Sequence, residues 1–146
     1  MELASCGYFV VCLSHEDSSG CFAPRSGPFN PEADVKCEYK ERNLQVKMRE
    51  NEILSLAEEI THPEFLESIC LDWKHNSLAG PLVLMGHSFG GISALGALFD
   101  CSEARACCVM DPWFKPHRED QLCQNEFQNT LIVMTERFRN YLKKDE

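Results

Sequence analysis

At 146 residues with 44% apolar side chains, the chain is long enough for one folded domain with a modest core, and too apolar to be intrinsically disordered. Its formal charge of −9 disfavours nucleic acid and anionic lipid headgroups as partners, because the long-range field of the chain repels polyanions. The nine cysteines include no C-x-x-C pair, which predicts free thiols in a reducing, cytoplasmic compartment and leaves extracellular disulfides as the alternative.

The first expected elements are the end of a helix and a buried strand. Residues 3–7 have the pattern of a helix closed by glycine, so the chain is expected to begin within a fold. Residues 8–13 are a continuous apolar run, typical of a parallel strand buried on both faces and too short for a signal peptide or a membrane span. Residues 18–34, rich in Ser, Gly, Pro and Asn, predict a long loop that is either a functional lid or mobile.

Two helices are expected next. Between residues 43 and 60 the apolar side chains fall on one helical face, which predicts an amphipathic structural helix; they are Val46, Ile53, Leu56, Ala57 and Ile60. The charged residues, including Lys47, Arg49 and Glu58, lie mostly outside that face. The segment Thr61-His62-Pro63-Glu64 has the spacing of a capping box, so a second helix is expected to begin there and continue to Trp73.

The second half of the chain alternates strands with helices. Strands are predicted at residues 81–85, 106–110 and 131–134, helices at 91–99 and 136–144, and a polar loop before Asn129. With the run at 8–13 this alternation predicts a mostly parallel sheet of four strands with helices on both faces, an α/β fold that forms a single domain over residues 1–146. Three cysteines inside apolar runs are expected to be small buried side chains: Cys12, Cys107 and Cys108.

The most informative motif lies between the strand at 81–85 and the helix that follows it. Gly86-His87-Ser88-Phe89-Gly90 has the pattern of a nucleophile elbow, a sharp turn that lifts a serine to where a base can reach it. Gly86 and Gly90 are expected on either side of Ser88 because side chains at those positions would collide within the turn. Three small residues of the following helix would let it pack close to its strand: Gly91, Ala94 and Ala97. The alternative is a glycine-rich connection with an ordinary surface serine. A phosphate-binding loop is excluded because no lysine follows Gly91.

A hydrolytic serine also needs a carboxylate that orients an imidazole base. Asp111 ends the strand directly after the elbow helix, the chain position of the acid in such sites, with a strand-end turn before Pro112 as the alternative. Since ligand sites form at the carboxyl ends of parallel strands, Ser14-His15, Ser88 and Asp111 are expected to converge.

The sequence does not place the base. Of the five histidines only His117 follows Asp111, and it comes before the next strand, where a solvated loop histidine is the simpler interpretation. His15 is expected to line the pocket, and His87 to be turned away from Ser88 by the elbow. Metal catalysis has little support, because no His or Cys pair has zinc-ligand spacing. Carboxylates such as Glu52 on the first long helix are interpreted as solvated charge.

These segments together resemble a known family, the platelet-activating factor acetylhydrolases of the α/β-hydrolase fold, in their plasma and intracellular type II forms. The resemblance extends in order and spacing from about residue 3 to residue 143. It is carried by Leu3-Ala4-Ser5-x-Gly7-x-Phe9-Val10-Val11 with His15-x-Asp17, by Gly86-His87-Ser88-Phe89-Gly90-Gly91, and by Asp111-x-Trp113.

The resemblance implies a serine esterase of the 1-alkyl-2-acetylglycerophosphocholine type. Such an enzyme hydrolyses short or oxidised sn-2 acyl groups of phospholipids, at a membrane surface, and uses neither a metal nor an organic cofactor. Ser88 would attack the ester, Asp111 would orient the base, and the backbone N–H of Phe89 would donate to the oxyanion. The second oxyanion donor would lie before Met1 and the base histidine after Glu146, so the fold is expected to be truncated at both ends.

The sequence has an elbow serine and an acid but no identified base, and two hypotheses about function follow. In the first, the gene product is an esterase of this family and these residues are part of it, nearly inactive alone. In the second, the short chain is the mature product and acts as a non-catalytic binding or interaction module. A reading frame that continues beyond Glu146 into a strand and a histidine would support the first and exclude the second.

Overall fold

The computed structural model describes residues 2–17, 19, 39–69, 80–116 and 129–142. Within these ranges three parallel strands form one sheet in the order β1-β2-β3. The strands are β1 (Leu82–His87), β2 (Ala104–Met110) and β3 (Thr130–Val133); the helices are α1 (Glu2–Ser5), α2 (Tyr39–Glu59), α3 (Pro63–Ser68), α4 (Phe89–Asp100) and α6 (Glu136–Leu142). This is a small parallel α/β arrangement, as the alternation of patterns predicts. The expected loop at 18–34, apart from Ser19, lies outside the described residues.

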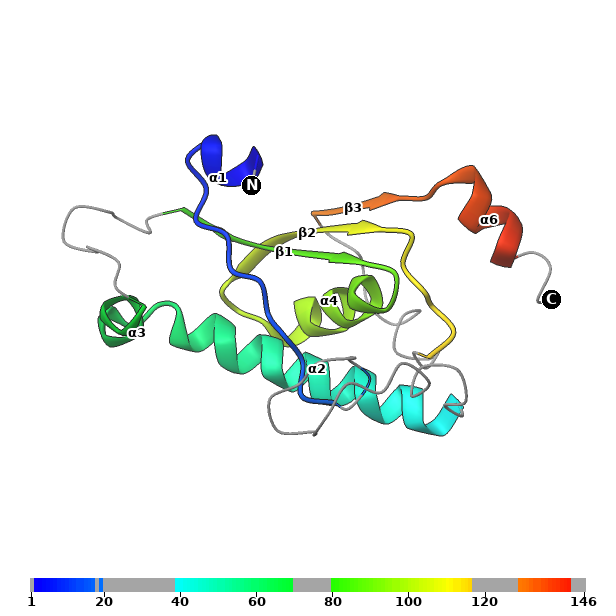
Figure 1. Cartoon of the computed structure of the whole chain (residues 1–146), viewed down its shortest axis with the longest axis horizontal. Helices are drawn as coiled ribbons and strands as arrows, with labels where there is room; N and C mark the ends of the chain where they lie inside the picture. Colours follow the sequence, from blue (N-terminus) through cyan, green and yellow to red (C-terminus); the bar gives the residue numbers. More distant parts are fainter. Residues whose placement is uncertain (1, 18, 20–38, 70–79, 117–128, 143–146) are drawn as a thin grey trace.

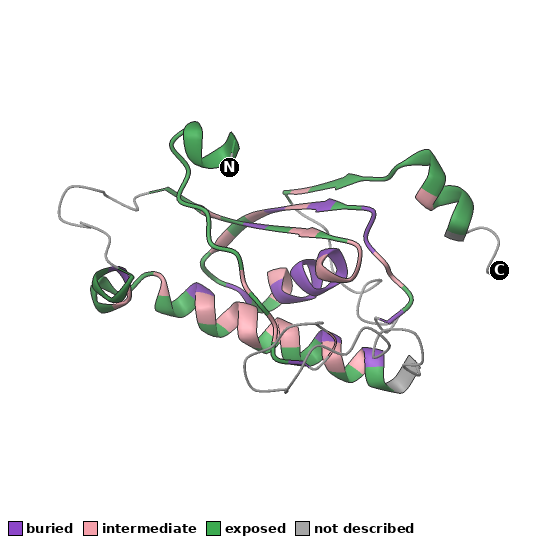
Figure 2. Ribbon diagram, viewed as in Figure 1, coloured by how far each residue is buried: buried purple, intermediate pink, exposed green. Residues whose placement is uncertain are grey.

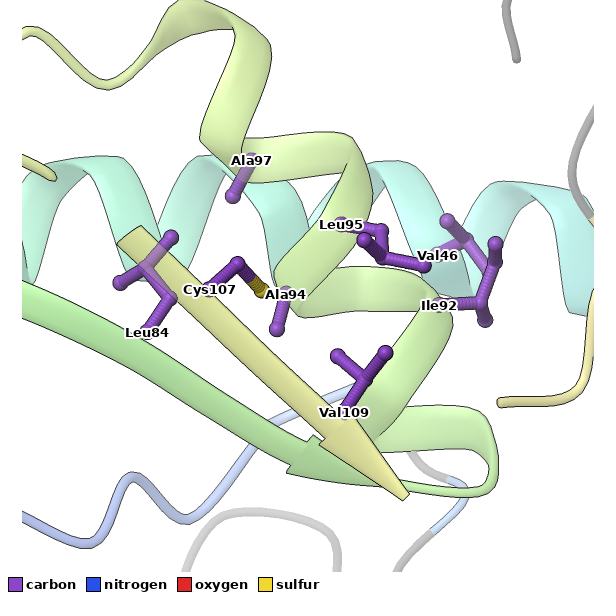
Figure 3. Packing of buried hydrophobic residues seen from close by; sticks show 8 residues of the cluster. All are labelled: Val46, Leu84, Ile92, Ala94, Leu95, Ala97, Cys107 and Val109. Atoms are coloured by element: carbon purple, nitrogen blue, oxygen red, sulfur yellow. The ribbon is translucent and has the colours of Figure 1, made fainter. Parts of the chain in front are cut away.

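Helix α4 is the middle of three layers, with the sheet on one side and α2 on the other (Figure 1). Its residues 91–97 are all buried, and Ala94 and Ala97 lie within the core as their small size predicts. Figure 3 shows how the three layers meet in one cluster: Val46 from α2; Ile92, Ala94, Leu95 and Ala97 from α4; and Leu84, Cys107 and Val109 from the strands. Full burial of a Val, Leu or Ile side chain contributes about 1.5–3 kcal/mol, so this cluster holds α4 against the sheet.

The other face of the sheet is open within the described residues, although helices on both faces were expected. Strand side chains alternate between faces, and the large apolar ones on the face away from α4 are exposed. Figure 2 shows exposed residues on all three strands. They include Val83 and Met85 of β1, Met110 of β2, and Leu131 and Val133 of β3. None of the described helices is both long and apolar enough to cross a bilayer.

The expected strand at residues 8–13 does not form. The segment crosses β1 in the view of Figure 1, but within the described part of the chain no backbone hydrogen bond joins it to the sheet. Tyr8 is 63% exposed and Cys12 is exposed as well, which also corrects the prediction that Cys12 is buried. Apolar composition gives only a preference for burial, whereas a strand needs a neighbouring backbone to pair with. Cys107 is buried as predicted, and Cys108 is half-buried.

The predicted capping box is also wrong. The Thr61 hydroxyl donates to the carbonyl oxygen of Glu58 at 2.7 Å, in the last turn of α2, instead of capping the next helix. His62 is the N-cap residue of α3, and Pro63 is its first residue. A hydroxyl beside a helix C-terminus is captured by the carbonyl groups left free there. Helix α3 ends at Ser68, and Trp73 lies outside the described residues.

Candidate active site

Ser88 is the single residue between the end of β1 and the start of α4, and its backbone conformation is strained. Its φ is 53° and its ψ is −117°, a region that costs a non-glycine residue on the order of 1–3 kcal/mol. Hydrogen bonds hold this turn on both sides: the Ser88 N–H donates to Met110 O at 2.9 Å, and the Trp113 N–H donates to Ser88 O at 3.0 Å. The Ser88 side chain is half-buried, and its Oγ makes no hydrogen bond within the described residues.

The glycines around Ser88 have different roles. A Cβ atom on Gly86 would lie 2.2 Å from the carbonyl oxygen of Gly90, so a side chain is excluded there as predicted. At Gly90 the same atom would meet nothing within 4 Å, so the expected collision is wrong at that position. The carbonyl group of Gly90 is what a side chain on Gly86 would strike, whereas a side chain on Gly90 itself would point into open space. A Cβ atom on Gly91 would lie 3.2 Å from Pro112, which follows β2, so a side chain there would be crowded.

Asp111 lies at the same edge of the sheet as Ser88. His87 is in register with Met110, and Met110 with Val133, so the three strands end level and the next residues come together. Asp111 has φ 45° and is 8% exposed, and its N–H donates to Val133 O at 2.8 Å. Ser88 and Asp111 therefore lie at one edge of the sheet, as expected, whereas Ser14 and His15 follow no strand of the described part.

Thr135, which the sequence analysis missed, holds the Asp111 carboxylate. The Thr135 N–H donates to Oδ1 at 2.6 Å and its hydroxyl donates to Oδ2 at 2.9 Å. The same hydroxyl accepts a hydrogen bond from the Phe138 N–H at 3.2 Å, so Thr135 also ties the start of α6 to the acid. A signal was available, because Thr135 directly follows the apolar run 131–134 at the carboxyl end of a predicted strand.

None of the described histidines is hydrogen-bonded to Ser88 or Asp111. His15 follows no strand; its Nδ1 lies 2.5 Å from Glu52 Oε2, and Glu52 Oε1 accepts the Glu16 N–H at 3.1 Å. Glu52 is therefore a hydrogen-bonded partner and not the solvated charge that was expected. His87 is exposed at the end of β1, and His62 precedes α3 at the far end of α2 (Figure 1). His75 and His117 lie outside the described residues.

A cationic and aromatic cluster surrounds Phe89, the first residue of α4. The guanidinium carbon of Arg49 lies 4.4 Å from the Phe89 ring centroid, that of Arg42 lies 5.4 Å away, and the Trp113 ring lies at 5.9 Å. The Phe89 N–H has no hydrogen-bond acceptor within the described residues. Arg49 was expected to lie outside the apolar face of its helix, and the structure shows it packed against the elbow instead.

Asp17 forms a buried ion pair with Arg49. Arg49 Nε donates to Asp17 Oδ2 at 2.6 Å, and the Asp17 side chain is fully buried. Burial alone would raise the pKa of Asp17, but hydrogen bonds from Arg49 and Ser19 outweigh it and lower the pKa. Asp17 therefore carries its charge at neutral pH and forms a buried ion pair with α2.

A parallel sheet in which a strained serine links a strand to a helix, with an acid at the end of the next strand, is the arrangement of the α/β-hydrolase class. The family described as "Platelet-activating factor acetylhydrolase, isoform II" matches residues 1–145, and the chain belongs to this family.

Curated relatives carry the same family name. A platelet-activating factor acetylhydrolase of Gallus gallus is 26% identical over 168 aligned residues, which cover 95% of this chain and 40% of that protein. The corresponding protein of Cavia porcellus is 28% identical over 139 residues, covering 82% of this chain and 32% of the relative. The chain thus spans less than half the length of these relatives. No solved structure matches it significantly.

Proposed function

We propose that the chain carries the nucleophile and the acid of a serine esterase that hydrolyses short or oxidised sn-2 acyl groups of phospholipids. The observation that carries this proposal is the strained turn at Ser88, tied by its backbone to the segment that holds Asp111. Backbone strain of this kind persists only where the surroundings enforce it, and it clusters at reactive residues. The relatives' name, acetylhydrolase, supports a short acyl group as the part removed.

The proposed reaction follows the serine-hydrolase sequence of steps. Ser88 Oγ attacks the carbonyl carbon of the sn-2 ester while a base takes the hydroxyl proton. The Phe89 N–H donates to the oxygen that becomes negative. The bond to the glycerol oxygen then breaks, the proton passes to that oxygen to release the lysophospholipid, and water hydrolyses the acyl-serine. Asp111 orients the base, and we propose that this base is a histidine in a longer product of the reading frame.

Hydrolysis of matched phospholipids by the longest product of the reading frame tests this proposal. We expect release of an sn-2 acetyl group at a much higher kcat/KM than release of an sn-2 oleoyl group from the same glycerophosphocholine. Ser88→Ala should reduce the rate on the order of 10⁴-fold or more, because the acyl-enzyme can no longer form. Ser102→Ala is the matched control, since Ser102 is an exposed serine after α4 whose hydroxyl donates a hydrogen bond to Glu103.

Two results would contradict the proposal. Full activity of Ser88→Ala would show that another group is the nucleophile. An inactive wild-type protein of full length would instead favour the alternative that the chain is a non-catalytic binding module.

A further inference from the structure

The residue that follows the proposed nucleophile is held by side chains from outside its own helix. The Phe89 ring lies near two guanidinium groups of α2, those of Arg49 and Arg42, and near the ring of Trp113 in the segment after Asp111. Two of these partners are cations and one is an aromatic ring tilted by 58°. A cation over an aromatic face contributes about 0.5–1 kcal/mol at an exposed site and about 2 kcal/mol or more when desolvated. The side chain of Phe89 is thus restrained from two directions.

Arg49 is itself oriented by a buried acceptor. Its Nε donates to Asp17 Oδ2 at 2.6 Å and its Nη2 donates to Ser19 Oγ, while the exposed fraction of the Arg49 side chain is 12%. Asp17 Oδ1 accepts both the N–H and the hydroxyl of Ser19, and Gln45 Nε2 donates to Asp17 O at 3.2 Å. A planar guanidinium bonded at two of its nitrogens has a fixed plane, which a flexible ammonium would not have.

The position of this contact matters because of what Phe89 supplies. Its N–H belongs to the peptide group that joins it to Ser88, whose φ and ψ are strained. An oxyanion donor is effective only when it already points at the place where charge develops. Any rotation of the Phe89 backbone would move both that N–H and the serine.

We infer that Arg49, held by Asp17, is a positioning residue for the oxyanion donor at Phe89. This inference rests on the proposed function. Arg49 acts through the ring of Phe89 and does not touch the reacting atoms. Its contribution is made in the transition state, where the oxyanion exists, and not in substrate binding.

The first arm of the test measures ester hydrolysis and phosphonylation of Ser88 by a fluorophosphonate in the longest product of the reading frame. We expect Arg49→Gln to lower kcat about 10- to 100-fold with KM changed by less than about twofold, less than the 10²–10³-fold cost of deleting an oxyanion donor. Arg49→Lys keeps the cation but loses the fixed plane, so it should recover part of kcat. Lys47→Gln, which removes an exposed cation on the same helix, should leave both parameters unchanged.

The second arm does not depend on activity. The backbone amide of Phe89 is followed by ¹⁵N NMR, with the amide of the buried Leu95 in the same helix as the internal reference. In Arg49→Gln we expect the Phe89 amide to shift and to exchange faster while Leu95 stays unchanged. If that variant unfolds, Arg49→Lys and Asp17→Asn supply the same comparison.

The outcomes separate the two claims. An unchanged Phe89 amide, or a kcat loss no larger than that of Lys47→Gln, would overturn the inference about Arg49 alone. A rise in KM with kcat unchanged would also overturn it, because it would make Arg49 a substrate-binding group. A wild-type protein that neither hydrolyses esters nor reacts with the fluorophosphonate would overturn the proposed function, whatever the NMR comparison gives.

Discussion

At the residue scale, the buried pair of Asp17 and Arg49 ties the segment after residue 13 to α2. The Asp17 side chain is fully buried and the Arg49 side chain is 12% exposed, so removing Arg49 leaves an uncompensated buried charge. Breaking such a pair costs on the order of 3–5 kcal/mol. This cost makes the pair a structural requirement in addition to any effect it has on Phe89.

The lowered pKa of Asp17 predicts a pH dependence of stability. A carboxyl group with a depressed folded-state pKa contributes stability above its ordinary value of about 3.9, and this contribution is lost as the pH falls through the folded-state pKa. We expect the free energy of unfolding, measured by urea denaturation between pH 3 and pH 7, to fall below about pH 4. In Asp17→Asn the whole curve should be lower and that part of the slope should disappear.

Asp100→Asn is the control for this measurement, because Asp100 is an exposed carboxylate at the end of α4. A slope in Asp17→Asn equal to that of the wild-type protein would show that Asp17 does not gain its hydrogen bonds on folding.

At the element scale, the elbow depends on one glycine more than on the other. We expect Gly86→Ala to abolish reaction at Ser88 and to destabilise the fold by about 3 kcal/mol or more, because the new Cβ atom would lie 2.2 Å from Gly90 O. Gly90→Ala is the matched control: it meets open space and should keep the activity, and alanine in a helix is favoured over glycine by about 0.5–1 kcal/mol. Thermal unfolding of both variants checks this, and equal melting temperatures would contradict it.

The elements that were predicted well are those whose residues are consecutive or nearly so in the sequence. Strand β1, Ser88 and helix α4 are consecutive, and Asp111 follows the next strand, so spacing alone places both candidate residues at one edge of the sheet. The run at 8–13 failed because a strand depends on a partner that is distant in sequence, and no local pattern reports whether that partner is present.

The contacts of Arg49, Glu52 and Asp17 were missed for a related reason. On a helix, charged residues outside the apolar face look solvated. Only the tertiary arrangement shows that α2 turns Arg49 toward the elbow and Asp17, and Glu52 toward His15. Thr135 could have been predicted, because it follows an apolar run as Asp111 does, and sites form at the carboxyl ends of parallel strands.

At the scale of the whole molecule, the face of the sheet that no described helix covers predicts poor solution behaviour of the 146-residue chain. Large apolar side chains, including Met85, Leu131 and Val133, are exposed on strands, and Tyr8 is exposed as well. Contiguous exposed apolar surface favours association, and the charge of −9 opposes it only weakly at physiological salt. We expect self-association in sedimentation velocity at micromolar concentration. A monodisperse monomer of 16.6 kDa would contradict this expectation.

If Ser88 is the nucleophile of an esterase, a fluorophosphonate should form a covalent adduct on its hydroxyl oxygen. The longest product of the reading frame is treated with the reagent, digested, and examined by peptide mass spectrometry. We expect one adduct, on Ser88, that is absent from Ser88→Ala and retained in Ser102→Ala. An adduct on any other residue, or none on a folded protein, would contradict this assignment.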